Sequence, residues 1–257
     1  MVKLDAITQE VLDKISEGFG QSGAFNLRQN GISLCHGDSE HIKIKKKEDK
    51  PGIDIFIDGT TIAEKVYIPV VVSVSGMTDL VYNDFYIEDG ADVTIIAGCG
   101  IHNSGCNESR HDGIHTFHVG KNANVRYEEK HYGEGNGTGS RILNPVTNIE
   151  LGENSVFTLD TVQIKGVDST VRETNVSMDA DAKLFVLERL MTDGEQKAES
   201  NIEVTMNGSG SAAQIISRSV GKGHSSQVNL IIQHCSIFIR KPGSVCLDGV
   251  SQLLHLL

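Results

Sequence analysis

A weak internal repeat of about thirty residues is the feature that most restricts how this chain can fold. A turn, a small residue and a β-type segment recur five times, and the segments start at Val93, Val125, Val156, Leu184 and Ala213. These starts are 32, 31, 28 and 29 residues apart, and several periods hold a second β-type segment: Val146–Leu151, Val171–Met178 and Ile202–Met206. Because each unit of such a chain pairs only with its neighbours, the period predicts an all-β fold, a coiled β-solenoid.

The composition agrees with this fold class. The chain has 27 glycines, 4 prolines and no tryptophan, and Val, Ile and Thr are plentiful, which favours short strands and many turns. Residues 4–18 predict one short amphipathic helix, which we expect to dock on the core as a cap; a partner-binding helix is the alternative. The glycines spell no phosphate-binding motif after a strand, which argues against nucleotide-binding α/β folds.

Equal offsets in successive coils stack about 4.8 Å apart, so the repeat predicts columns of side chains. We assign the column three residues after each start to the core: Ile96, Glu128, Leu159, Leu187 and Ile216. A register slip in its coil would explain the one exception, Glu128. The next column points the other way, outward: Ala97, Glu129, Asp160, Glu188 and Ser217. The same outer face then carries Cys99 beside His131, with Glu129 one pleat away.

Five of the ten histidines and two of the five cysteines lie between residues 98 and 132. Thiolate and imidazole suit zinc and iron–sulfur chemistry. The candidate metal ligands are Cys99, Cys106, His111, His115, Glu129 and His131, and four of them are also candidates for holding a cluster: Cys99, Cys106, Glu129 and His131. Local spacing opposes a simple zinc site, because His111 and His115 lie about 13 Å apart on an extended strand and share an ion only if the chain bends at Gly113. Asp160 and Glu188 are expected to form a solvated acidic stripe, whereas a solvated and a functional role both stay open for Glu129.

Five stretches together carry a family resemblance: residues 98–132, Ser22–Arg28, Ile68–Val70, Val81–Phe85 and Arg141–Pro145. They resemble the SufB/SufD family of iron–sulfur cluster assembly proteins, most closely its short archaeal and anaerobe-type members. The resemblance covers about residues 20–227, so we divide the chain into an N-terminal helix and linker (1–23), a β-helix core (24–227) and an atypical C-terminal segment (228–257) with Cys235 and Cys246.

The resemblance implies a right-handed parallel β-helix that acts as a scaffold for nascent, transiently held iron–sulfur clusters and their iron. It also implies a SufC-type ABC ATPase as partner and a homodimer or heterodimer formed through the β-helix. The altered C-terminal segment puts ATPase binding in question.

Other function classes fit the sequence less well. The formal charge of −11 argues against nucleic-acid binding, and no apolar run is long enough to cross a bilayer. Five cysteines are too few and too odd a set for a secreted disulfide framework, so we expect a cytoplasmic protein. A non-enzymatic scaffold is the leading hypothesis. A zinc-dependent enzyme on a β-solenoid and an interaction module with incidental Cys and His are the alternatives.

Overall fold

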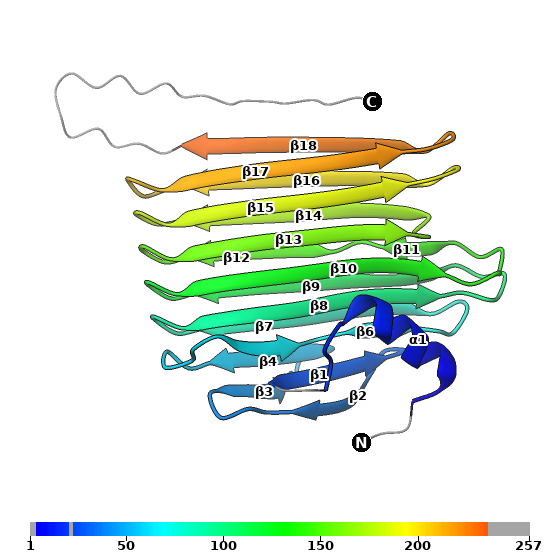
Figure 1. The fold of residues 1–257 in the computed structure, drawn as a ribbon, viewed down its shortest axis with the longest axis horizontal. Coiled ribbons are helices and arrows are strands. Elements are labelled where there is room, and N and C mark those ends of the chain that lie inside the picture. Colours follow the sequence, from blue (N-terminus) through cyan, green and yellow to red (C-terminus); the bar gives the residue numbers. More distant parts are fainter. Residues whose placement is uncertain (1–3, 21–22, 236–257) are drawn as a thin grey trace.

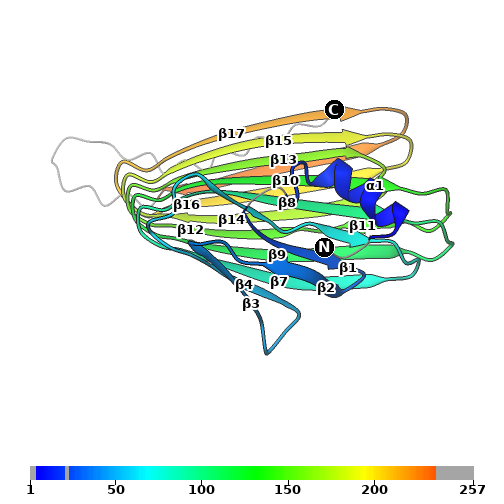
Figure 2. The same ribbon diagram turned by 60° about the horizontal axis from the view of Figure 1, so that its bottom comes forward.

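Two β-sheets face each other across the interior and form a solenoid of about six turns (Figure 1, Figure 2). The computed structural model describes residues 4–20 and 23–235. The first sheet contains β1 (Ala24–Gln29), β2 (Ile32–Gly37), β5 (Glu64–Tyr67), β6 (Val70–Val72), β8 (Asp92–His102), β10 (Asn124–Glu134), β13 (Val156–Lys165), β15 (Lys183–Thr192) and β17 (Ala212–Gly221). The second contains β3 (Ile42–Lys46), β4 (Gly52–Ile57), β7 (Thr78–Ile87), β9 (Ser109–Val119), β11 (Arg141–Leu143), β12 (Val146–Leu151), β14 (Ser169–Met178), β16 (Lys197–Met206) and β18 (Ser226–Cys235).

The chain alternates between the sheets, and each strand pairs in parallel with its counterpart one coil away. Among the residues described, antiparallel pairing occurs only in the N-terminal hairpins β1–β2 and β3–β4. The all-β solenoid with one short N-terminal helix is therefore confirmed. The boundary expected at residue 227 falls inside β18, which pairs with β16 up to Cys235, so the β-helix continues past it. Cys246 and the rest of 236–257 lie outside the described residues.

The recurring turn has a physical cause in the backbone. The residue before each small residue adopts positive φ, between 59° and 81°, at Gly90, Asn122, Asn154, Asp181 and Gly210. Glycine, asparagine and aspartate tolerate this left-handed conformation best. The small residue that follows is buried in four of the five turns: Ala91, Ala123, Ser155 and Ala182. These turns lead from the second sheet to the first, at the left in Figure 1. The main apolar core lies beside them and is filled by stacked rings such as Phe85 and Phe117, whose centroids are 4.4 Å apart.

The register differs from the predicted one in the third coil. Val125 pairs with Val93 and with Phe157, not with Val156. The inward column that packs the core is therefore Ile95, Tyr127, Leu159, Val186 and Ile215. The predicted core column was right for Leu159 and wrong for its other four members, because side chains two residues after the inward-facing Val93 point inward and those three residues after it point outward. Glu128 faces outward in register and needs no slip to explain it.

This correction moves the acidic column as well. The side chains four residues after each corrected start face the interior: Ala97, Glu129, Thr161, Glu188 and Ser217. Glu129 and Glu188 are each 1% exposed, so the expected solvated stripe is wrong for Glu188. Asp160 faces outward, where it pairs with Arg126 and Arg189.

The N-terminal helix α1 (Ala6–Ile15) lies against the outside of the first sheet, over β8 and β10 (Figure 2). Val11 and Ile15 are fully buried beneath it. Gly98 and Gly100 occupy outward positions of β8 under the helix. A Cβ built on Gly98 would lie 2.4 Å from the carbonyl oxygen of Ile15. The helix is therefore a docked cap, as predicted, and no helix within residues 4–20 and 23–235 is long and apolar enough to cross a membrane.

We predict that Gly98→Ala separates α1 from the sheet, because the added methyl group overlaps backbone atoms that cannot rotate away. Amide hydrogen exchange in α1 should rise at least tenfold while the strands keep their protection. Thr94→Ala, at an outward position of the same strand, is the control. Unchanged exchange in α1 of the Gly98 variant would contradict this packing.

Candidate functional site

Polar side chains occupy the interior between the main apolar core and a smaller apolar cluster that includes Cys99 and Ile101. We call them the interior polar cluster: Asp79 and Asn83 of β7, His111 and His115 of β9, Tyr127, Glu129 and His131 of β10, Arg172 of β14, Glu188 of β15 and Ser200 of β16. Each of these side chains is almost completely buried. Buried polar groups need partners to offset the loss of water, so the contacts within the cluster decide its chemistry.

Arg172 lies between two buried carboxylates. Its Nη1 donates to Oε2 of Glu129, and its Nε lies 3.4 Å from Oε1 of Glu188. Ser200 and Ser217 also donate to Glu188, at 2.7 and 2.8 Å. Burial raises the pKa of Glu129, but His131 and Arg172 outweigh it and hold that pKa well below its usual value. Glu129 is therefore an ionised carboxylate inside the β-helix.

A chain of hydrogen bonds links His115 to the same carboxylate. The hydroxyl of Tyr127 donates to Oε1 of Glu129 at 3.0 Å, and Nδ1 of His115 lies 2.6 Å from that hydroxyl oxygen. Since Tyr127 has one proton to donate, Nδ1 of His115 carries the proton of the second bond, and the Nε2 lone pair faces the Asn83 amide at 3.4 Å. Burial lowers the pKa of His115 to about 4, so the ring is neutral near pH 7.

A second carboxylate fixes His111. Asp79 accepts from Nε and Nη2 of Arg28 and lies 3.1 Å from Nδ1 of His111. Burial raises the pKa of Asp79, but the bonds from His111 and Arg28 prevail and hold it well below its usual value. Nδ1 of His111 therefore donates to Asp79, whereas its Nε2 is buried without a hydrogen-bond partner.

Cys99 and His131 are register partners on neighbouring strands, as the repeat predicted, but they face the interior and not the outer surface. Cys99 packs among apolar side chains such as Val70 and Ile101. Burial, reinforced by the Glu129 charge, raises the pKa of Cys99 well above its usual value, so the group is a neutral thiol. Gln163, the register partner of His131 on the next coil, has neither amide atom hydrogen-bonded.

The structure brings most of the predicted site residues into one interior but not onto one point. Nε2 of His131 lies 3.5 Å from Glu129, and His115 reaches Glu129 through Tyr127. Cys106 lies apart, exposed in the loop after β8. Within the described part of the chain, no three His, Cys, Asp or Glu side chains converge closely enough to hold a metal ion.

Sequence reasoning missed the groups that hold the cluster together, above all Arg172 and Asp79. Both occupy inward positions of strands in the second sheet, which alternate buried and exposed residues. The sequence signal for such groups is a charged residue at a strand position whose neighbours two residues away are apolar or buried. Recognising it requires the relative register of the two sheets, which the repeat in one sheet does not supply.

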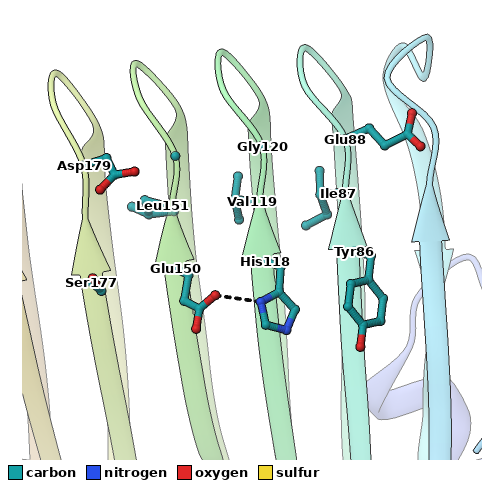
Figure 3. A pocket seen from close by; sticks show the side chains of 11 residues that line it. Tyr86, Ile87, Glu88, His118, Val119, Gly120, Glu150, Leu151, Ser177 and Asp179 are labelled. Atoms are coloured by element: carbon teal, nitrogen blue, oxygen red, sulfur yellow. Dashed lines mark hydrogen bonds and ion pairs between the residues drawn. The ribbon is translucent and has the colours of Figure 1, made fainter.

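The outer surface carries a separate groove at the turn end of the second sheet, with a volume of about 590 Å³. Figure 3 shows Tyr86, His118 and Glu150 side by side on neighbouring strands. The ring of His118 stacks on Tyr86 with centroids 5.0 Å apart, and its Nδ1 lies 2.7 Å from Glu150. These contacts satisfy His118 on the opposite face of β9 from His111 and His115, so the groove is not part of the interior polar cluster.

We predict that Arg172→Met lowers the free energy of unfolding by about 3–5 kcal/mol, because two buried carboxylates lose their shared cation. Urea unfolding followed by circular dichroism measures this. Arg126→Met is the matched control: Arg126 pairs with Glu128 and Asp160 on the outer face, where an exposed pair contributes less than about 1 kcal/mol. Equal losses in the two variants would contradict the central role of Arg172.

Comparison with known proteins identifies the family. The family model described as SUF system FeS cluster assembly, SufBD core domain, matches residues 78–230. Among curated proteins, none matches the chain. The matched segment runs from β7 into β18 and includes all ten residues of the interior polar cluster. Because the match covers more than half of the chain, this protein belongs to the SufBD core-domain family of the SUF system, which assembles iron–sulfur clusters.

Proposed function

We propose that this protein is a non-enzymatic scaffold that holds nascent iron–sulfur clusters and works with a SufC-type ABC ATPase. Family membership supports a role in the SUF system. Within the chain, the observation that carries the proposal is the pairing of Cys99 with His131 on adjacent coils, next to the ionised Glu129. Thiolate, imidazole and carboxylate are all ligands that iron accepts.

The buried thiol needs activation before it can bind iron. A metal binds the thiolate, whereas the apolar surroundings and Glu129 keep Cys99 protonated. Arg172 neutralises part of the Glu129 charge. Iron(II) arriving beside Cys99 would favour the thiolate and release its proton.

Access is the second requirement. Cys99 is 4% exposed and lies beneath the sheet that α1 covers, so reagents reach it only when the β-helix opens locally. Opening a packed interior requires free energy, and a partner ATPase is a source of it. This supports, on physical grounds, the ATPase partnership that the family resemblance implies.

A cluster also needs more ligands than this interior offers. Iron–sulfur clusters are usually held by four cysteine thiolates, whereas Cys99 is the one buried cysteine among the three whose side chains are described. A second chain is one source of further ligands. In the described part, β17 and β18 each have a neighbour on one side, and such open edges favour pairing with another β-helix. We therefore propose a homodimer or a heterodimer formed through the β-helix.

We predict that anaerobic reconstitution with iron and sulfide gives visible charge-transfer absorption, and that Cys99→Ser reduces the retained cluster at least fivefold. Cys106→Ser, at the exposed thiol, is the matched control and should retain the cluster. Co-purification with a co-expressed SufC-type ATPase tests the partner separately. Absence of a cluster in the intact protein, or equal retention in both variants, would oppose the scaffold.

The same preparation separates the two alternatives. One zinc ion per chain in anaerobically purified protein, together with hydrolase or lyase activity, would favour a zinc enzyme. Full function of a Cys99→Ala, His131→Ala double variant in a growth assay would favour an interaction module.

A further inference from the structure

Two imidazole rings point into one space above Gly113. His111, Gly113 and His115 are successive inward positions of β9, and all three are buried. A Cβ built on Gly113 would lie 3.2 Å from Nε2 of His111 and 3.3 Å from Nε2 of His115. The sequence predicted that a shared ion needs a bend at Gly113, but β9 pairs with β7 without a break on both sides of this residue. The missing side chain at Gly113 instead lets the two rings lean toward each other.

Both rings present a lone pair to this space. Nδ1 of His111 donates to Asp79, and Nδ1 of His115 donates to the Tyr127 hydroxyl, which donates in turn to Glu129. In the neutral form of each ring, the single proton then lies on Nδ1 and Nε2 carries the lone pair. Nε2 of His111 has no partner, and Nε2 of His115 has a long contact of 3.4 Å with the side-chain amide of Asn83.

We propose that His111 and His115 form a buried binding site for one first-row divalent transition-metal ion. Protein metal sites commonly fix each ligating imidazole through a bond from its other nitrogen to a carboxylate or similar acceptor, and both rings have that support here. Neutral imidazole is a preferred ligand of Fe²⁺, Co²⁺ and Zn²⁺. The ion would replace the long Asn83 contact, and water or another small ligand would complete its coordination.

A cleft near this site lies at the N-terminal end of the solenoid. This cleft, of about 980 Å³, lies between the β1–β2 and β3–β4 hairpins, and Arg28 and Asn83 line it. Asn83 also contacts His115, so the cleft reaches the edge of the two-histidine space. The site uses neither Cys99 nor His131, so the inference goes beyond the proposed scaffold role and does not depend on it.

Cobalt titration of untagged, metal-free protein tests the site, with Co²⁺ as the probe and Zn²⁺ as competitor. We expect one Co²⁺ per chain, displaced by Zn²⁺, and X-ray absorption showing two imidazole ligands. His111→Gln and His115→Gln should each weaken binding at least tenfold. His118→Gln, on the outer face of the same strand, and Cys99→Ser should bind as the unmodified protein does.

Gly113→Ala is the sharper variant because it leaves both histidines in place. Gly113 does not have positive φ, so alanine fits the backbone, and its methyl group takes the space between the two Nε2 atoms. We expect an unchanged circular dichroism spectrum and at least tenfold weaker Co²⁺ binding. The proposal is overturned if this folded variant binds normally, if Cys99→Ser abolishes binding, or if the unmodified protein binds no Co²⁺ or binds it through fewer than two imidazoles. Because the last measurement uses the unmodified chain, it decides the question even if a variant fails to fold.

Discussion

Parallel hydrogen bonding between β8 and β10 fixes which side chains face the interior of this protein. The two strands pair without a break from Asp92 to His102, and side chains alternate along them. Every second residue of one coil therefore stacks on its counterpart in the next. This stacking puts Glu129 beside Ala97 and His131 beside Cys99. The register between coils, rather than local sequence spacing, therefore determines which side chains meet in the interior.

Charges placed inside in this way must be balanced there. Arg172 contacts both Glu129 and Glu188, which lie on β10 and β15 with one strand between them. Asp79 is paired in the same way with Arg28 and His111. Partnered carboxylates remain ionised where isolated ones would take up a proton. The same enclosure keeps Cys99 a neutral thiol. Cys99, the cluster ligand that we propose, is thus buried in an unreactive form.

Sequence periodicity predicted the architecture well because its cause is local. Left-handed turn residues such as Asn122 and Asn154, each followed by a small residue, recur in five of the connections from the second sheet to the first. The face of each column was predicted poorly. An inverted pleat placed Glu188 outside, although it is buried. A shift of one residue at Val156, where Phe157 is the true partner of Val125, put Asp160 in the column of Glu129 in place of Thr161. Because side chains alternate along a strand, an error of one residue assigns a core side chain to the surface and a surface side chain to the core.

The sequence by itself determined the repeat, the turns, the capping helix and the stacking of Cys99 on His131, because these follow from backbone preference and equal spacing along one chain. Only the tertiary structure decided which face is inside and what the facing sheet contributes. Arg172 and Asp79 meet the predicted residues across the interior, and the rings of His111 and His115 converge because Gly113 leaves room. Contacts between two sheets depend on their relative register and separation, which no periodicity within one strand encodes.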